Sequence, residues 1–331
     1  MSRYLIAEIG GNHEGDFEVA KDLLYQACES PVDCVKFQVY TGDSLVNSRL
    51  SPDRNKHFKR FELSIDQYLQ LAEICEGKGK DFNASIWSHE LIKEFEKYLN
   101  FIKIGSGDLT HYYLLEKVAE LQIPIIVSTG LSHAYEVDDV VSFIEGCDPY
   151  YKERDHICVM QCTSMYPIPF SDANLAVLDS YKKLKHRIGY SDHTEGFTAL
   201  KFAYAKGADV LEFHFSSPEL KAERTFRDHK VSLVADEVRA LAADLDEIDD
   251  LLGSSVKAPC EIEITTDHVT TFRRGVFLMK NLSKGHILTL DDLVFLRPAI
   301  GIPANEFSKL IGRKLKRDVL SLETLSFDMF E

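Results

Sequence analysis

The feature that most constrains this chain is the alternation of short apolar runs with amphipathic helical patterns through residues 1–253. Eight of the runs are rich in β-branched or aromatic residues and contain no proline, as is typical of buried parallel strands. They cover residues 4–9, 34–39, 81–85, 101–104, 125–128, 157–161, 187–190 and 210–215. Eight strands that are each followed by a helix predict an α/β fold, a parallel sheet closed into a (β/α)8 barrel.

Amphipathic segments fill the intervals between these runs. They cover residues 17–28, 68–76, 91–99, 114–121, 137–144, 175–184, 199–205 and 233–252. Ser64 and Gln67 form a capping-box pattern before the second segment, and Gly253 ends the last one. An open doubly wound sheet is the alternative, but the count of eight and the lack of a G-x-G-x-x-G turn after the first run favour the barrel.

The rest of the chain has a different pattern. Residues 254–270 show little periodicity and contain Pro259, which indicates a linker. Residues 271–331 contain short apolar runs and a turn at Lys284-Gly285, which predict a small module of strands and irregular structure. We therefore expect a barrel domain over 1–253, a linker over 254–270 and a small domain over 271–331.

Composition narrows the class of protein. The 331 residues carry a formal net charge of −15, which disfavours nucleic acid and anionic membranes as partners. The first residues lack the basic and apolar segments of a secretory signal, and no apolar run of membrane-spanning length follows. The seven cysteines form no C-x-x-C pair, as in a reduced cytoplasmic protein.

Polar residues lie where each predicted strand ends, which is the rim that holds the active site in such barrels. They are Glu8, Lys36, Gln38, Ser85, Lys103, Ser106, Asp108, Ser128, Ser164, Tyr166, Asp192, His193 and His214. A barrel that served stability alone would not need a polar group at every strand end.

Two lysines of this set indicate an anion site. Lys36 and Lys103 lie within strands, where a buried ammonium group is costly unless it is paired. The serines at 106, 128 and 164 adjoin glycines or turns, where hydroxyl and backbone N–H groups can surround a phosphate. The alternative is that the lysines form structural ion pairs with Glu8, Asp108 or Glu212.

Two histidines indicate a metal site. His193 and His214 end adjacent strands, which lie about 5 Å apart, so that both imidazoles could bind one ion beside Glu8. Imidazole ligands with open positions suit Mn, Fe, Co or Zn, and ligand type alone does not choose among them. The alternative is two buried barrel histidines without a ligand role. His13 is either a third rim histidine or a residue that fixes its own loop.

Several segments resemble the sialic acid synthase family, which comprises N-acetylneuraminate synthases and their legionaminate, pseudaminate and spore-coat relatives. The matching segments in the barrel are Ala7-Glu8-Ile9-Gly10, Asn12-His13-Glu14-Gly15, Val35-Lys36-Phe37-Gln38, Lys103-Ile104-Gly105-Ser106-Gly107-Asp108, Ser128-Thr129-Gly130, Gln161-Cys162-Thr163-Ser164, Tyr166-Pro167, Ile188-Gly189-Tyr190-Ser191-Asp192-His193, Glu212, His214-Phe215, Asp228-His229 and Ser232. Residues 272–274, 282–285, 296–298 and 310–313 are similar to the antifreeze-like (SAF) domain of these synthases.

The resemblance implies a synthase that condenses phosphoenolpyruvate with an N-acetylmannosamine-like aldehyde to give a nine-carbon 2-keto acid and phosphate. His193 and His214 would hold a divalent metal, most often Mn²⁺ with Mg²⁺ or Co²⁺ as alternatives, together with Glu8 or its bound water. The residues implied to bind phosphoenolpyruvate are Lys36, Lys103, Ser85, Ser106, Ser128 and Ser164. Those implied to face the sugar are Gln38, Asp108, Tyr166, Asp228 and Arg297, and the catalytic set is Glu8, Lys103, Asp108 and Asp192.

The family also implies a domain-swapped homodimer, in which Arg297 reaches the partner's sugar site. Departures from the family pattern cluster near the sugar: the segment from Asn83 to Ser88 with Trp87, Phe213, and the stretch 216–227. Trp87 serves either packing or sugar stacking. A legionaminate or pseudaminate synthase acting on a diacetamido-trideoxyhexose therefore stays open. A different metal-dependent barrel aldolase or hydrolase stays open too, as does a carbohydrate-binding scaffold without activity.

Overall fold

The computed structural model describes residues 3–331. The chain divides into two compact units, one that ends at Gly253 and one that runs from Ser254 to Glu331. Each unit has a hydrophobic core of its own. No helix within 3–331 is long and apolar enough to cross a membrane.

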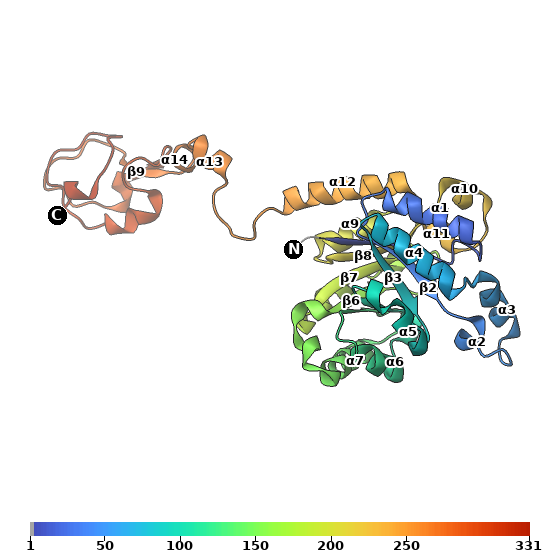
Figure 1. Cartoon of the computed structure of the whole chain (residues 1–331). Coiled ribbons are helices and arrows are strands. Elements are labelled where there is room, and N and C mark those ends of the chain that lie inside the picture. Colours follow the sequence, from blue (N-terminus) through green and yellow to red (C-terminus); the bar gives the residue numbers. More distant parts are fainter. Residues whose placement is uncertain (1–2) are drawn as a thin grey trace. The chain divides into compact units, whose positions relative to one another are not determined.

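The first unit is a closed barrel of eight parallel strands, as predicted (Figure 1). The strands are β1 (Tyr4–Gly10), β2 (Cys34–Val39), β3 (Asp81–Ile86), β4 (Ile102–Ile104), β5 (Ile125–Ser128), β6 (Ile157–Cys162), β7 (Arg187–Asp192) and β8 (Val210–His214). Strand β1 closes the barrel by pairing with both β2 and β8. Glu8 is thereby placed opposite Lys36 on one side and His214 on the other.

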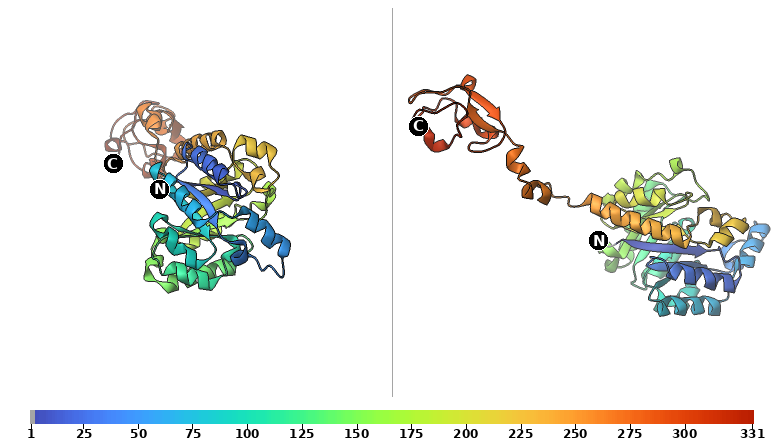
Figure 2. Two further views of the ribbon diagram at one scale, coloured as in Figure 1. Left: turned by 45° about the vertical axis from the view of Figure 1, so that its right-hand side comes forward. Right: turned by 90° about the horizontal axis from the view of Figure 1, so that it is seen from above.

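Helices surround the strands on the outside (Figure 1 and Figure 2). Those near the predicted segments are α1 (Phe17–Cys28), α4 (Ile65–Gly77), α5 (His89–Phe95), α6 (Tyr112–Ala119), α7 (Ala134–Cys147), α8 (Val177–Tyr181), α9 (Thr198–Ala205) and α12 (Ala235–Leu252). Ser64 caps α4 through the expected capping box. Apolar stripes on these helices pack against the outward side chains of the strands to form the main core.

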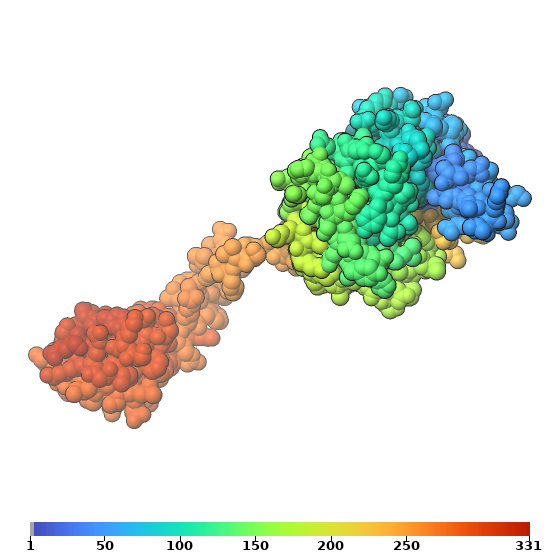
Figure 3. Space-filling view, turned by 90° about the horizontal axis from the view of Figure 1, so that it is seen from below, coloured from blue at the N-terminus to red at the C-terminus, as the bar shows by residue number. Residues whose placement is uncertain are grey.

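Four further helices were not predicted, and all follow the carboxyl end of a strand. They are α2 (Gly42–Leu45), α3 (Pro52–Phe61), α10 (Pro218–Glu223) and α11 (Asp228–Val231). Helix α3 has only two buried residues, Asn55 and Phe61, so its sequence lacks the apolar stripe that reveals a helix. The segment that carries α2 and α3, drawn in blue, protrudes at the margin of the first unit (Figure 3).

The interior of the barrel is a smaller core of its own. Its buried residues are Ile6, Cys34, Phe101, Ile126, Cys158, Met160 and Val210. Because side chains alternate along a strand, residues two and four positions further on also point inward. This period places polar side chains above the inner core at the carboxyl ends of the strands.

The second unit is built around a two-stranded antiparallel sheet. It contains α13 (Glu261–Thr265), α14 (His268–Thr271), β9 (Gly275–Leu278) and β10 (Leu293–Leu296). The segment 254–270, expected as a linker of low periodicity, thus includes α13 and the start of α14. Buried residues such as Val276, Leu288 and Phe330 hold the irregular remainder together.

Candidate active site

The candidate site begins with inward-facing residues that lie two positions beyond the inner core. Glu8, Lys36, Lys103, Ser128 and Glu212 each follow an inner-core residue at that spacing along the chain. All five are buried. The strand period, rather than any loop, therefore brings these side chains to one rim.

Buried lysines and glutamates alternate across this rim. Lys36 Nζ lies 2.5 Å from Glu8 Oε2, and Lys103 Nζ lies 3.2 Å from Glu212 Oε1. Glu212 Oε2 lies a further 4.0 Å from Lys36 Nζ and so links the two pairs. Ser191 donates to Glu212 Oε1 at 3.2 Å. Both lysines are therefore ion-paired with Glu8 or Glu212, whereas Asp108 pairs with neither among the described residues.

These pairs decide the charge of the rim. Burial alone would lower the pKa of Lys36, but Glu212 and Glu8 raise it above its usual value. Burial alone would raise the pKa of Glu212, but Lys103 and Lys36 hold it below its usual value. Burial raises the pKa of Glu8 in spite of Lys36. The rim thus combines two fixed ammonium groups with one firmly ionised carboxylate and one that binds a proton more readily.

Hydroxyl groups gather beside the lysines. Ser85 accepts a hydrogen bond from Lys36 Nζ at 3.3 Å, and Ser106 accepts one from the Gly130 N–H at 3.1 Å. A Cβ atom on Gly130 would lie 2.7 Å from Ser106 Oγ and 3.2 Å from Ser164 Cβ, so only glycine lets these serines approach each other. The Ser128 hydroxyl is buried and has no hydrogen-bond partner within 3–331. These groups are arranged to donate to a bound anion.

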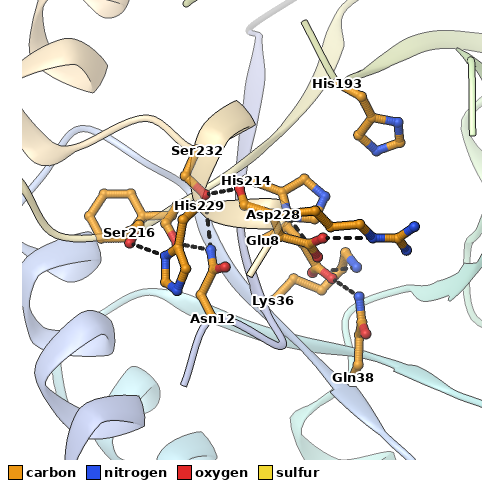
Figure 4. A network of polar contacts seen from close by, with 12 residues as sticks. Glu8, Asn12, Lys36, Gln38, His193, His214, Ser216, Asp228, His229 and Ser232 are labelled. Carbon is orange, nitrogen blue, oxygen red and sulfur yellow. Dashed lines mark hydrogen bonds and ion pairs between the residues drawn. The ribbon is translucent and has the colours of Figure 1, made fainter. Parts of the chain in front are cut away.

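Two histidines complete the inner rim, and Asp228 lies beside them (Figure 4). The ring of Tyr166 packs on both histidines. The rings of His193 and His214 have centroids 5.4 Å apart, and burial lowers the pKa of both. The carbonyl oxygen of Thr163 lies 2.7 Å from His193 Nδ1, so Nδ1 donates and Nε2 keeps its lone pair. His214 Nδ1 is buried without a hydrogen bond and lies 3.7 Å from Asp228 Oδ2.

Neutral imidazoles with an available lone pair fit a divalent metal, and the Thr163 contact is the kind that orients such a ligand. Glu8, which the family resemblance suggested as a further ligand, is not free for that role. Within 3–331 no three His, Cys, Asp or Glu residues are grouped to hold a metal ion. Glu8 is occupied instead, because Oε1 accepts from Gln38 at 2.7 Å and Oε2 faces Lys36. Among residues 3–331, the side chains suited to such an ion at this rim are therefore the two imidazoles.

Asp192, which the sequence placed in the catalytic set, faces away from this rim. Its carboxylate accepts from the Tyr190 hydroxyl at 3.0 Å and from the N–H and hydroxyl of Thr194 at 2.8 and 3.0 Å. The strand period explains this, since His193 and Ser191 point inward and Asp192 between them points outward. Asp192 therefore fixes the turn that presents His193, which is a positioning role.

His13 belongs to a loop rather than to the inner rim. Its Nδ1 accepts from the Gly15 N–H at 3.0 Å, and burial lowers its pKa to about 4. The neighbouring Asn12 donates to the Phe215 carbonyl at 2.8 Å and to Ser232 Oγ at 2.9 Å (Figure 4). This loop thus joins the end of β1 to the loop after β8.

Two of the residues expected to face a sugar, Asp108 and Asp228, lie on short helical segments that follow β4 and β8, whereas Gln38 lies on β2. Burial raises the pKa of Asp108, and a hydrogen bond from Trp87 opposes that rise. Trp87 also packs on Tyr40, with ring centroids 5.1 Å apart. Burial likewise raises the pKa of Asp228 to about 6, opposed by Arg227, whose Nε lies 3.3 Å from Asp228 Oδ1. Trp87 therefore both packs and donates.

Arg297 belongs to the second unit, where its guanidinium lies 4.9 Å from the centre of the Phe272 ring. Its predicted approach to a sugar in a partner barrel stays a prediction.

Sequence reasoning missed three features of this site. Glu212 was weighed only as a structural partner, and Ser191 was not singled out, although both lie two residues before a site histidine and the strand period would have found them. Arg227 gave no such signal, because its position depends on the fold of a loop.

Comparison with known proteins decides the family. The model of the NeuB family matches residues 23–257, and that of the SAF domain matches residues 273–331. The chain belongs to the NeuB family. This NeuB-family chain is 31% identical to the N,N'-diacetyllegionaminic acid synthase of Legionella pneumophila, over 100% of this chain and 95% of that protein. It is 32% identical to the human N-acetylneuraminate-9-phosphate synthase, over 99% of this chain and 92% of that one.

Solved structures agree with this assignment. A spore coat polysaccharide biosynthesis protein E from Chromobacterium violaceum has 25% identity and a TM-score of 0.83, with both chains covered completely. The sialic acid synthetase of Leptospira borgpetersenii, solved with citrate, has 25% identity and a TM-score of 0.74 over 81% of this chain and 91% of that chain. The NeuB-family chain is thus an enzyme of the sialic, legionaminic and pseudaminic acid synthase group.

Proposed function

We propose that this enzyme condenses phosphoenolpyruvate with the open-chain aldehyde of an N-acetylmannosamine-like amino sugar, and that it releases phosphate and a nine-carbon 2-keto acid. The observation that carries the proposal is the arrangement of one barrel rim. Two buried, ion-paired lysines and a group of serines lie beside two neutral histidines. Such a rim can hold an anionic donor and a carbonyl acceptor next to each other.

Phosphoenolpyruvate would bind on the lysine side. Lys36 and Lys103 are fixed by carboxylates and would face its carboxylate and phosphate, with hydroxyl donors supplied by Ser106, Ser128 and Ser164. Because these groups are already in place, little reorganisation is needed as charge moves during the reaction. Ser85, which contacts Lys36, would complete this side.

The histidine side would hold a divalent metal, for which we propose Mn²⁺ with Mg²⁺ or Co²⁺ as alternatives. His193 would bind it through Nε2, and His214 would supply the second imidazole. When bound, such an ion acts as a Lewis acid toward a carbonyl oxygen.

Proton movements would fall to the carboxyl groups. As the enol carbon of phosphoenolpyruvate forms the new C–C bond, the aldehyde oxygen becomes a hydroxyl and takes up one proton. Burial raises the pKa of Glu8 and of Asp108, so either group binds a proton more readily than an ordinary carboxyl group and could supply that proton. Water then adds to the carbon that bears the phosphate and gives up one proton. The C–O bond to phosphate breaks as the remaining hydroxyl proton passes to the departing phosphate, which leaves the ketone.

Gln38, Tyr166, Asp228 and Arg297 would contact the sugar. We propose that Arg297 does so from a partner subunit in a domain-swapped homodimer, and that the enzyme works in the cytoplasm, where phosphoenolpyruvate is available.

A Schiff-base aldolase fits less well, because that chemistry needs an uncharged lysine and Glu212 and Glu8 hold Lys36 protonated.

The test uses metal-stripped protein resupplied with Mn²⁺ and given phosphoenolpyruvate with each of three kinds of sugar. The sugars are N-acetylmannosamine, its 6-phosphate and 2,4-diacetamido-trideoxyhexoses. We expect Mn²⁺-dependent release of phosphate and formation of a 2-keto acid with at least one sugar, and no trapping by borohydride. Failure to bind phosphoenolpyruvate, or covalent trapping of a lysine, would contradict the proposal.

A further inference from the structure

Two loops that border the candidate site meet in a cluster of buried polar side chains. One loop follows β1 and carries Asn12 and Glu14, and the other follows β8 and leads into α11. Ser216, His229 and Ser232 of the second loop and α11 region are fully buried. Because buried polar groups are costly unless they are paired, their hydrogen bonds indicate what the cluster holds together.

The imidazole of His229 spans the two loops with both of its nitrogens. Nδ1 lies 2.8 Å from the Ser216 hydroxyl (Figure 4), and Nε2 lies 3.4 Å from Oε1 of Glu14. A carboxylate only accepts hydrogen bonds, so Nε2 donates to Glu14 and Nδ1 accepts from Ser216. Burial lowers the pKa of His229 in spite of Glu14, which agrees with a neutral ring that bridges the two groups.

The order of carboxylate, imidazole and hydroxyl is that of a hydrolase triad, but this cluster cannot act as one. The side chains of Ser216 and His229 are both 0% exposed, so no substrate carbonyl can reach the serine oxygen. The cluster therefore acts by holding backbone segments in place and not by contact with a substrate.

The segment that His229 holds carries a carboxylate of the site. His229 follows Asp228 in α11, and Oδ2 of Asp228 lies 3.7 Å from Nδ1 of His214. The Asp228 carbonyl accepts from the Ser232 hydroxyl at 2.7 Å, and that hydroxyl accepts from the Asn12 amide at 2.9 Å. Helix α11 has four residues, too few to be stable through its own hydrogen bonds. Side-chain bonds to the loop after β1 therefore fix where Asp228 lies.

We infer that His229 and Glu14 are positioning residues, which tie α11 to the loop after β1 and so hold the Asp228 carboxylate in place for the sugar. This inference rests on the proposed function, because it requires Asp228 to contact the sugar. Lys36 and Lys103 are held on strands by their own carboxylates and are independent of this tie. Loss of the tie should therefore weaken binding of the sugar and leave binding of phosphoenolpyruvate unchanged.

The first experiment measures kcat and the KM of each substrate in full-length Glu14→Ala with Mn²⁺, using whichever of the three kinds of sugar the wild type turns over. The Glu14 side chain is partly exposed, at 22%, so its truncation leaves no buried cavity. We expect E14A to raise the KM for the sugar about three- to tenfold and to leave the KM for phosphoenolpyruvate unchanged. Glu14→Gln keeps an acceptor for His229 Nε2 and should restore most of the sugar affinity.

The matched control is Glu18→Ala, which removes an exposed carboxylate four residues further along the chain that pairs with Lys21. E18A should leave both KM values unchanged. His229→Gln gives a second test of the tie, because its amide can still donate to Glu14 but no longer reaches Ser216. We expect H229Q to raise the KM for the sugar as well, so the inference stays testable if E14A does not fold.

A double-mutant cycle separates positioning of Asp228 from a general loosening of the loops. If Glu14 acts through Asp228, adding E14A to Asp228→Asn should raise the KM for the sugar no further than D228N alone, whereas independent effects would add. Additive effects would overturn the inference, as would an equal rise in both KM values or an E14A enzyme that behaves like E18A. In each of these cases turnover continues and the synthase is retained. Absence of turnover with every sugar would reject the proposed function and this inference with it.

Discussion

The residues proposed to hold phosphoenolpyruvate lie mostly on or next to strands, whereas most of those that border the sugar lie on loops and short helices. Lys36, Lys103 and Glu212 are buried within the hydrogen-bonded barrel and pair with acidic or basic partners. Arg227 is exposed, and its loop packs on α3 through Phe226 and Phe61. The barrel ladder fixes the first group, while the second can change without disturbing the barrel. One rim can therefore keep one shared substrate and vary the other.

The strongest test of this difference is Lys103→Met, which removes a strand-borne cation and keeps an apolar stem. We expect kcat/KM to fall about 10²–10³-fold with every sugar, because the lost charge faces the shared substrate. Circular dichroism would show whether the protein still folds, since Glu212 loses its closest partner. A loss confined to one sugar would contradict the proposed difference between strand-borne residues that bind phosphoenolpyruvate and loop-borne residues that border the sugar.

The two histidines proposed to bind the metal also lie at strand ends. We therefore expect their replacement to have a large effect, as replacement of a strand-borne lysine does. His214→Ala removes one of the two proposed imidazole ligands and should weaken Mn²⁺ binding by at least about 10–100-fold, as measured by calorimetry on metal-stripped protein. Asp192→Asn is the matched control that keeps both ligands, and it should weaken binding less. Unchanged Mn²⁺ affinity in H214A would contradict the assignment.

The strand-borne and loop-borne residues of the site also differ in how far the sequence predicts their positions. Strand residues such as Lys36 and His214 follow a period of two, so their shared rim could be predicted before the structure was known. The same rule, applied more strictly, would have placed Asp192 on the outward side of its strand and would have singled out Glu212. Helix α3 and Arg227 could not be predicted, because a solvated segment without an apolar stripe is positioned by tertiary contacts.

The Asn12→Ala variant should show how the loop after β1 connects the phosphoenolpyruvate-binding residues to those that border the sugar. Its amide bonds the Phe215 carbonyl and Ser232, and removing it leaves buried groups unpaired at a cost of about 1–3 kcal/mol in the free energy of unfolding. Denaturant titration measures that change, and kinetics should show a higher KM for the sugar than in the wild type. An equal rise in the KM for phosphoenolpyruvate would mean that the loop supports both sides alike.

Trp87→Phe should give the smallest effect, a shift in pH dependence. Burial already raises the pKa of Asp108, and the Trp87 hydrogen bond opposes that rise by stabilising the carboxylate. Without this donor the pKa rises further, so a limb of the pH profile that reflects ionised Asp108 moves to higher pH. The profile of kcat/KM for the sugar measures it, and an unmoved limb would argue that Asp108 does not titrate in the reaction.

Strand-borne cations should bind phosphoenolpyruvate independently of the loop-borne residues. Calorimetric titration of phosphoenolpyruvate into metal-loaded enzyme without sugar tests it in the wild type, K103M and R227Q. We expect R227Q to bind phosphoenolpyruvate as the wild type does and K103M to bind it far more weakly. Equal weakening in both variants, or wild-type affinity in K103M, would contradict it.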